Sequence, residues 1–262
     1  MNAKILKITS KDNAKIKILK QLGQKKYRDE SGKFLVENAV IIHDAAKVGI
    51  VFDEIFVIKD FIEKNKEKFD FIIEKNGSGE YYLIDEKINK SFSSMDTAPG
   101  IAAVYSKPAR KLDLAQPIIY LNAINDPGNL GTIFRSALAF GLKNIVVDER
   151  SADVYNPKTI SAAKDAIFKL NIEFDKDLKI LKEIKSKMPI FATRLEKSES
   201  LEILTKEKLF CVVLGSESHG VEKKIQEISD NFIRIPMSEE IESLNVAASA
   251  AIIFYEIYSE KH

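Results

Sequence analysis

The sequence predicts an α/β protein made of two α/β domains in succession. Short apolar segments of strand length alternate with segments of helical periodicity over about the first 100 residues, and this alternation begins again near residue 117. Between the two series, SKPARKLDLAQP (106–117) carries two prolines and several charges, a composition typical of a linker. We therefore expect a first domain at 1–106, a linker at 107–116 and a second domain at 117–262.

In the first domain, residues 10–22 predict a short basic helix. Ile16, Leu19 and Leu22 share one face of it, and Ser10 or Asp12 is the expected cap. The segments expected next, in chain order, are the strand FLVE (34–37), the helix NAVIIHDAAKVG (38–49), the strand IFVI (55–58), a charged helix around FIEKNKEKF (61–69), and the strands FDFIIE (69–74) and YYLID (81–85).

The second domain predicts a mostly parallel sheet, because its strand candidates are apolar on both faces. Those candidates are PIIYLN (117–122), NIVVD (144–148), PIFAT (189–193), LFCVVLG (209–215) and FIRIP (232–236). Helices are expected at GTIFRSALAFG (131–141), near 157–168, within SHGVEKKIQEI (218–228) and at SLNVAASAAIIFYEIY (243–258).

Total charge does not point to a nucleic-acid partner, because 40 basic residues almost balance 39 acidic ones. The first 33 residues nevertheless hold ten Lys or Arg against three acids. Cys211 is the only cysteine, so disulfides and cysteine zinc sites are excluded. We find neither a signal peptide nor an apolar run of membrane length, and expect a cytoplasmic protein that makes no membrane contact.

Three polar turns follow apolar strands of the second domain, where open α/β sheets bind ligands. In the first, Pro127, Gly128 and Gly131 predict a tight turn, and a helix is expected to begin near Thr132. Arg135 then falls in the first turn of that helix, near an end that favours anions. An arginine on a solvated helix face explains the pattern equally well.

The other two turns are VVLGSESHG (212–220) and the approach to the last helix. In the former, Gly215 and Gly220 flank a polar loop that could simply cap the next helix. In the latter, Ser243 fits an ordinary N-cap. A cap does not account for Asn245, which we expect two residues inside an otherwise apolar helix.

Together these segments resemble the three motifs of the SpoU (TrmH) family of RNA 2'-O-ribose methyltransferases, in the same order and separation. DPGNLGTIFRSALAFG (126–141) corresponds to the first motif, LGSESHGV (214–221) to the second, and IPM (235–237) with ESLNVAASAAIIFYE (242–256) to the third. Residues 10–37 and 93–108 are similar to the start and close of the substrate-binding domain that precedes the catalytic domain in many members.

The resemblance implies a carboxy-terminal α/β methyltransferase domain tied into a trefoil knot, after a smaller, ribosomal-protein-like RNA-binding domain. It also implies S-adenosylmethionine as methyl donor and no metal ion. Carried over by position, donor contacts fall at Gly215, Ile235 and Leu244, with Thr193 and Met237 as further candidates.

The same resemblance places the catalytic machinery. Arg135 would act at the ribose hydroxyl, either as its base or by electrostatic positioning. Asn129 and Glu217 would orient the nucleotide and Arg135, and Ser243 and Asn245 would complete the pocket. Three departures accompany the match: Asn122 where relatives often carry Asp, Ser218 where many carry Gly, and residues 238–241 in place of a glycine-rich turn.

For RNA, the basic first 33 residues offer phosphate contacts and one stacking ring, although a solvated helix face would have the same composition. The candidates are Lys11, Lys15, Lys25, Lys26, Tyr27 and Arg28. The apolar surplus of the last helix, with its small residues, predicts a homodimer through the second domain.

Two alternatives stay open. A non-catalytic RNA-binding or ribosome-assembly protein could keep the same fold, although the retained motif residues argue against it. An enzyme of this type could also act on tRNA, but the amino-terminal domain favours ribosomal RNA.

Overall fold

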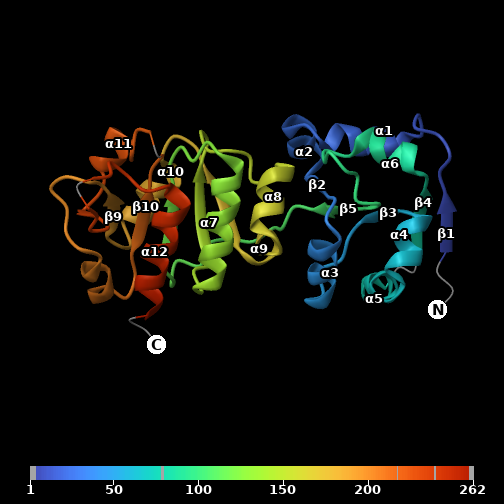
Figure 1. Cartoon of the computed structure of the whole chain (residues 1–262). Helices are drawn as coiled ribbons and strands as arrows, with labels where there is room; N and C mark the ends of the chain where they lie inside the picture. Colours follow the sequence, from blue (N-terminus) through green and yellow to red (C-terminus); the bar gives the residue numbers. More distant parts are fainter. Residues whose placement is uncertain (1–3, 78–79, 217, 239, 260–262) are drawn as a thin grey trace. The chain divides into compact units, whose positions relative to one another are not determined.

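The computed structural model describes residues 4–77, 80–216, 218–238 and 240–259, except for the side chain of residue 205. The chain forms two compact units (Figure 1). Unit 1 comprises Met1–Pro108 and Tyr155–Ser161, and unit 2 comprises Ala109–Val154 and Ala162–His262. Within the described residues, no helix has the length and apolarity needed to cross a membrane.

Unit 1 is a five-stranded mixed sheet with helices on both faces (Figure 1). Its elements in chain order are β1 (Lys4–Lys7), α1 (Ala14–Leu22), α2 (Lys25–Ser31), β2 (Lys33–Val36), α3 (Ala39–Lys47), β3 (Glu54–Ile58), α4 (Lys59–Lys64), α5 (Lys66–Asn76), β4 (Glu80–Ile84), α6 (Glu86–Phe92) and β5 (Ile101–Ser106). The strand order is β1-β4-β3-β5-β2, in which β5 runs antiparallel to both of its neighbours.

The apolar faces of α1 and α6 pack on one side of this sheet. Ile16 and Leu19 of α1 and Ile88 of α6 join Phe56 and Val104 of the sheet in one buried cluster. The predicted face of the first helix is therefore confirmed. Its cap is Asn13, whose side chain accepts from the Lys15 N–H at 2.9 Å, so the expectation of Ser10 or Asp12 is wrong.

One expected strand of unit 1 is a helix. FDFIIE lies inside α5, where Phe69, Ile72 and Ile73 are buried at the three- and four-residue spacing of a helix face. The long charged helix expected before it is interrupted at Asn65, whose side chain donates back to the Phe61 carbonyl at 3.1 Å.

Unit 2 is a six-stranded parallel sheet with the order β11-β9-β10-β6-β7-β8. Its elements are β6 (Ile118–Leu121), α7 (Pro127–Ala139), β7 (Asn144–Asp148), α9 (Ala166–Lys169), β8 (Asn171–Asp175), α10 (Lys179–Lys185), β9 (Ile190–Thr193), a 3₁₀ helix (Leu201–Lys206), β10 (Cys211–Leu214), α11 (Lys223–Gln226), β11 (Asn231–Ile233) and α12 (Val246–Ser259). α8 (Pro157–Ala163) begins in the Tyr155–Ser161 segment of unit 1 and ends in unit 2. The chain steps outward from β6 to β8, then crosses to the other half of the sheet.

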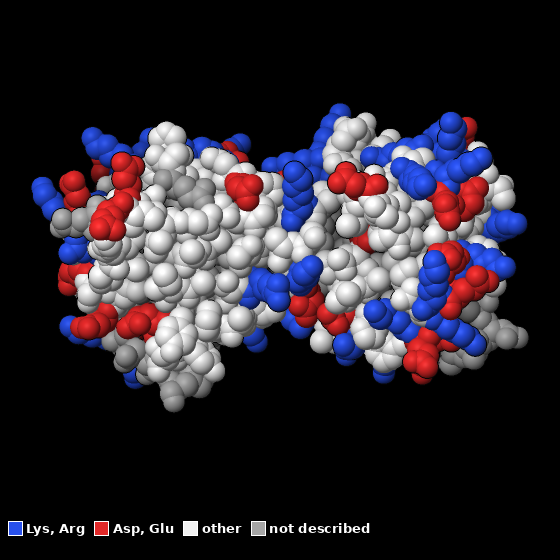
Figure 2. Space-filling model, in the orientation of Figure 1, with Lys and Arg blue, Asp and Glu red and all other residues white. Residues whose placement is uncertain are grey.

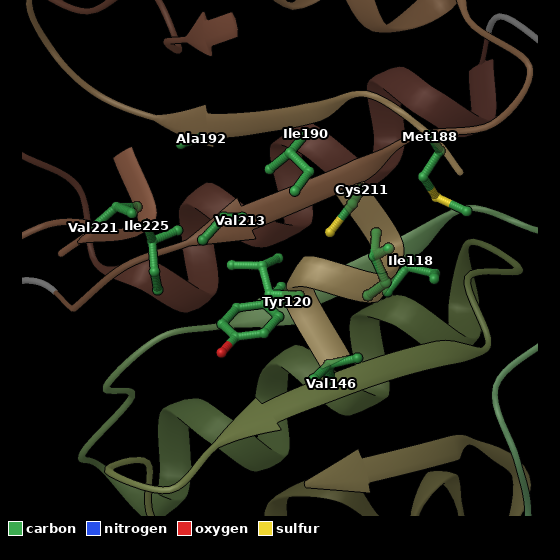
Figure 3. Packing of buried hydrophobic residues seen from close by; sticks show 12 residues of the cluster. Ile118, Tyr120, Val146, Met188, Ile190, Ala192, Cys211, Val213, Val221 and Ile225 are labelled. Carbon is green, nitrogen blue, oxygen red and sulfur yellow. The ribbon is translucent and has the colours of Figure 1, made fainter. Parts of the chain in front are cut away.

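The core of unit 2 is apolar and includes the single cysteine (Figure 3). Burial raises the pKa of the Cys211 thiol far above its usual range, which keeps it an unreactive hydrophobic side chain. The hydroxyl of Tyr120 reaches this core as well and donates to Asp175 Oδ2 at 3.1 Å. This hydroxyl group, on β6, is thus paired with a carboxylate at the end of β8.

Both helices next to the predicted functional turns begin elsewhere than expected. α7 begins at Pro127, with Asp126 as its cap, so Pro127 and Gly128 form its first turn rather than a separate tight turn. Arg135 consequently lies in the third helical turn, not the first. α12 begins at Val246, which leaves Asn245 just outside the helix.

Candidate functional site

A cavity of about 520 Å³ lies in unit 2 at the carboxyl ends of β9, β10 and β11. Its volume falls in the range of about 300–1,000 Å³ that is usual for small-molecule sites. Its walls include all five positions expected to contact a methyl donor, together with Ser243. These residues are Thr193, Gly215, Ile235, Met237, Ser243 and Leu244.

The loop after β10 forms one wall of this cavity. Its described residues, 215–216 and 218–221, are called the β10 loop below. The loop folds back on itself, since the Gly220 N–H donates to the Ser216 carbonyl at 2.8 Å and the Ser216 N–H donates to the Gly220 carbonyl at 3.2 Å. A Cβ atom at Gly215 would overlap the Gly220 carbonyl and the Val221 nitrogen. Position 215 therefore has room only for glycine. Position 220 favours glycine for a different reason, because its backbone φ is 64°, in the left-handed region.

The lining combines an apolar floor with hydroxyl groups. The apolar side chains are those of Leu195, Leu214, Val221, Ile233, Ile235, Met237, Leu244, Val246 and Ile253. The hydroxyl side chains are those of Thr193, Ser216, Ser218, Ser243 and Ser249. Such a lining fits a ligand with a flat apolar group and several polar edges, which is the character of an adenine nucleoside.

Arg194 shapes a second wall, which the sequence reasoning missed. Its guanidinium donates to the carbonyls of Glu196 and Lys197 at 2.8 and 2.6 Å, and stacks 3.4 Å from the centre of the Phe232 ring. The wall after β9 is therefore held by side chain to backbone bonds. The only signal in the sequence was a basic residue directly after a strand of this sheet.

The first and third motifs meet through two asparagines. The Asn245 amide donates to Asn129 Oδ1 at 3.1 Å, while Asn245 Oδ1 accepts from the N–H groups of Ala247 and Ala248 at 2.9 and 3.3 Å. Asn245 is thus the N-cap of α12, and the expectation that it lies inside the helix is wrong. Its side chain joins the amino-terminal ends of α7 and α12.

Arg135 is not among the described residues that line the cavity. Arg135 is exposed on α7, six residues or about 9 Å of helical rise beyond Asn129, and it makes no hydrogen bond or ion pair with the described residues. Glu217 lies outside the described residues. The geometry therefore leaves the Arg135 guanidinium available to an incoming group.

The basic candidates of unit 1 divide into two classes. Lys11, Lys25 and Lys26 are exposed, and Tyr27 is half-buried beside Lys26. Arg28 is only 3% exposed and donates to the Leu22 carbonyl at 2.6 Å, so its assignment as a phosphate contact is corrected: it ties α2 to the end of α1.

Lys15 is also engaged within unit 1. It pairs with Glu54 and lies 4.8 Å from the centre of the Tyr82 ring; the hydrogen bond with Glu54 raises the pKa of its ammonium. Four further lysines on α1 and α6 are exposed, although the sequence analysis did not name them as RNA contacts: Lys17, Lys20, Lys87 and Lys90. Figure 2 shows basic side chains gathered over α1 and α6.

The part of the chain that the structure describes contains no group of three His, Cys, Asp or Glu side chains placed to hold a metal ion.

Comparison with known proteins gives matches along most of the chain. Residues 116–255 match the family model described as SpoU rRNA Methylase family, and residues 13–103 match the MRM3-like substrate binding domain. The 23S rRNA (guanosine(2553)-2'-O)-methyltransferase RlmP of Bacillus subtilis is 30% identical over 252 residues, which cover 95% of this chain and 98% of that protein.

Solved structures match over nearly the full length. A crystal structure of an RNA 2'-O ribose methyltransferase has a TM-score of 0.79 and 27% identity, and covers 98% of this chain and 99% of its own. An AdoMet-bound rRNA methyltransferase from Sinorhizobium meliloti has the same fold, with a TM-score of 0.80, 23% identity and 97% of each chain covered. With its second and third motifs lining one cavity and family matches in both halves, the chain belongs to the SpoU rRNA methylase family.

Proposed function

We propose that this protein is an S-adenosylmethionine-dependent RNA methyltransferase that methylates a ribose 2'-hydroxyl of ribosomal RNA. One observation carries this proposal: the five positions matched to donor contacts, although dispersed between residues 193 and 244, line a single cavity at the carboxyl ends of three neighbouring strands. Its family and the length of its match to a 23S rRNA methyltransferase support the same activity.

The residues that line the cavity are compatible with bound S-adenosylmethionine. Gly215, Ile235 and Leu244 would hold it, with Thr193 and Met237 beside them, and the absence of a side chain at Gly215 lets the β10 loop close on that wall. When bound, S-adenosylmethionine supplies an electrophilic methyl group on a sulfonium. The chain must therefore align the ribose oxygen with that methyl and accommodate the hydroxyl proton.

Arg135 is the residue we assign to the ribose hydroxyl. An exposed guanidinium can donate to the hydroxyl oxygen and to an RNA phosphate together, and it stays protonated, which favours positioning and electrostatic stabilisation over proton abstraction. The Asn129–Asn245 pair would hold the nucleotide beside it, with Ser243 at the cavity wall. Glu217 belongs to this proposal by its position in the second motif.

Unit 1 would bind the RNA stem through its exposed lysines while one loop nucleotide enters unit 2. We assign the domain limits 1–106 and 117–262, joined by 107–116, to these two tasks. The substrate would be ribosomal RNA, and methylation would take place in the cytoplasm. A tRNA substrate is not favoured, since the nearly full-length relative named above acts on 23S rRNA.

We further propose a homodimer that forms through α7 and α12. Ile252, Tyr255 and Tyr258 are exposed on α12, and Phe140 at the end of α7 lies 6.0 and 5.9 Å, between ring centres, from the two tyrosines. Figure 2 shows a broad area over these two helices without charged side chains. Apolar surface of this kind is typical of an interface.

Two measurements test the activity. Calorimetry should detect S-adenosylmethionine binding that S-adenosylhomocysteine displaces, and mapping of 2'-O-methyl groups in ribosomal RNA from cells with and without the gene should show one lost modification. Binding without any lost modification in any RNA would favour the non-catalytic assembly protein. No binding at millimolar donor would refute the methyltransferase assignment.

A further inference from the structure

Asn122 is a buried residue for which the proposed chemistry has no role. It directly follows β6, is 1% exposed, and has a partner for each of three polar groups. Its backbone N–H donates to the Leu214 carbonyl at 2.9 Å, its Oδ1 accepts from the Glu222 N–H at 2.9 Å, and its Nδ2 donates to Asp148 Oδ2 at 2.9 Å.

Two of these bonds fall at the two ends of the β10 loop. Leu214 immediately precedes Gly215, and Glu222 immediately follows Val221. Leu214 and the described residues between these ends line the cavity. Asn122 therefore joins both ends of one cavity wall to the end of a central strand.

Asp148 determines which way the Asn122 amide faces. Asp148 Oδ1 accepts from the Ala123 N–H at 3.0 Å, the Ser151 N–H at 2.9 Å and the Ser151 hydroxyl at 2.6 Å. These bonds hold the carboxylate beside Nδ2, so Oδ1 is turned toward the Glu222 N–H. Arg150 completes the network by pairing with Glu222 and Asp148.

We propose that Asn122 is a positioning residue that sets the shape of the methyl-donor site through the β10 loop, and that an amide is required at this position. The proposal rests on the proposed function of the cavity. An amide can accept from Glu222 and donate to Asp148 at once, whereas an ionised carboxylate of the same shape can only accept.

Asn122→Asp would place two carboxyl groups side by side in a buried position. Near neutral pH the introduced carboxyl would lose the bond to Asp148 and repel it, which should loosen the β10 loop. At lower pH the two carboxyls share one proton, and that proton restores the missing donor. The other ionisable groups facing the pair are Arg150, Glu222 and Tyr120.

The matched rescue exchanges the two side chains. In the double variant Asn122→Asp/Asp148→Asn, an amide at 148 can donate to the carboxylate at 122, which still accepts from the Glu222 N–H. Positions 122 and 148 together then carry one carboxylate, as in the parent protein. Asn144→Asp is the control, because Asn144 is also 1% exposed but begins β7, at the opposite end of the sheet from the cavity.

The experiment combines a ligand-free and a ligand-dependent readout on the full chain. Amide hydrogen exchange of Gly220 and Glu222 should be faster in Asn122→Asp than in the parent or the double variant. Calorimetry at about pH 8 should show donor affinity reduced about tenfold or more by Asn122→Asp and recovered to within about threefold by the double variant. Relative to the parent, the loss should shrink at about pH 5.5.

The outcomes separate the two proposals. A parent protein that does not bind the donor contradicts the proposed function. Asn122→Asp with parental exchange and parental affinity at both pH values contradicts the role of Asn122. A loss that Asn144→Asp reproduces in the folded protein, or that the double variant leaves unrepaired, also contradicts it, because such a loss would come from general destabilisation.

Discussion

The side chain of Asn245 makes two kinds of hydrogen bond, one that caps α12 and one that joins it to α7. The sequence indicated that Asn245 belongs to the site but not which residues it contacts. Its Oδ1 caps α12, while its amide bonds to Asn129, 116 residues earlier. Motif resemblance located Asn245, but local periodicity could not reveal a partner so distant. The same limit applies to Lys15 and Arg28. The basic composition of the first 33 residues indicated that they contact RNA, but Lys15 pairs with Glu54 and Arg28 donates to the Leu22 carbonyl.

The two functions of Asn245 can be separated by substitution. Asn245→Ala should lower unfolding free energy by about 1 kcal/mol, the usual cost of a lost cap. Asn245→Asp should keep the cap, because aspartate caps equally well, but it cannot donate to Asn129. We expect Asn245→Asp to retain the parental midpoint in urea while methyl transfer falls. Equal activity in Asn245→Asp and the parent would show that the bond to Asn129 has no part in catalysis.

Arg135→Ala should leave donor affinity nearly unchanged and reduce methyl transfer by at least about a hundredfold, the scale of losing a participant at the reacting hydroxyl. Arg135→Lys should not restore the rate, because an ammonium lacks the planar fork that reaches hydroxyl and phosphate together. Single-turnover methylation at saturating donor and RNA measures this, with Arg110→Ala as an exposed arginine control in the same unit. If Arg135→Ala methylated RNA at the parental rate, the assignment of Arg135 to the ribose hydroxyl would be wrong.

Among the elements, the strands were easier to predict than the helix starts. Apolar runs such as IFVI and NIVVD give β3 and β7 almost residue for residue, because a buried strand leaves a compact signal. Pro127 and Gly128 predicted a turn, yet Asp126 followed by proline is also the start of a helix. FDFIIE suits a strand or a helix face equally in a short window, and packing in unit 1 selected the helix.

The β10 loop gives the element-scale prediction. Gly215→Ala should displace the Gly220–Val221 backbone, because a Cβ atom at position 215 would overlap it. The displacement is costly, since the overlapping atoms belong to the backbone and not to a flexible side chain. Donor affinity should fall at least about tenfold, and folding stability by about 1–3 kcal/mol. Calorimetry and urea unfolding measure the two effects. Gly141→Ala, at a positive φ with open space, is the control that should cost stability alone.

For the whole chain, the class of fold and the parallel sheet of unit 2 could be predicted, but the strand order could not. Nothing in the periodicity of PIFAT or LFCVVLG indicates that β10 lies between β9 and β6. That order depends on crossover connections, which local patterns do not encode. The cavity was therefore predictable only through motif resemblance, even though each of its residues was visible in the sequence.

The homodimer is the prediction for the whole molecule. Light scattering at micromolar concentration should give twice the chain mass of 29.5 kDa. Charges placed on the exposed face of α12, as in Ile252→Lys/Tyr255→Lys, should give a monomer, because burying unpaired ammonium groups in an interface is costly. Val40→Lys, at an equally exposed apolar position on α3, should stay dimeric. A monomeric parent protein would contradict the proposed interface.

The placement of the cavity has a consequence for how the protein matures. Its walls come from the ends of β9, β10 and β11 and the approach to α12, so no binding site exists until the last quarter of the chain has joined the sheet. The donor can thus bind only finished molecules, and at a concentration of 100 times its dissociation constant it would add about 2.7 kcal/mol to their stability. The supply of methyl donor would then determine how long each enzyme molecule survives, as well as how fast it works.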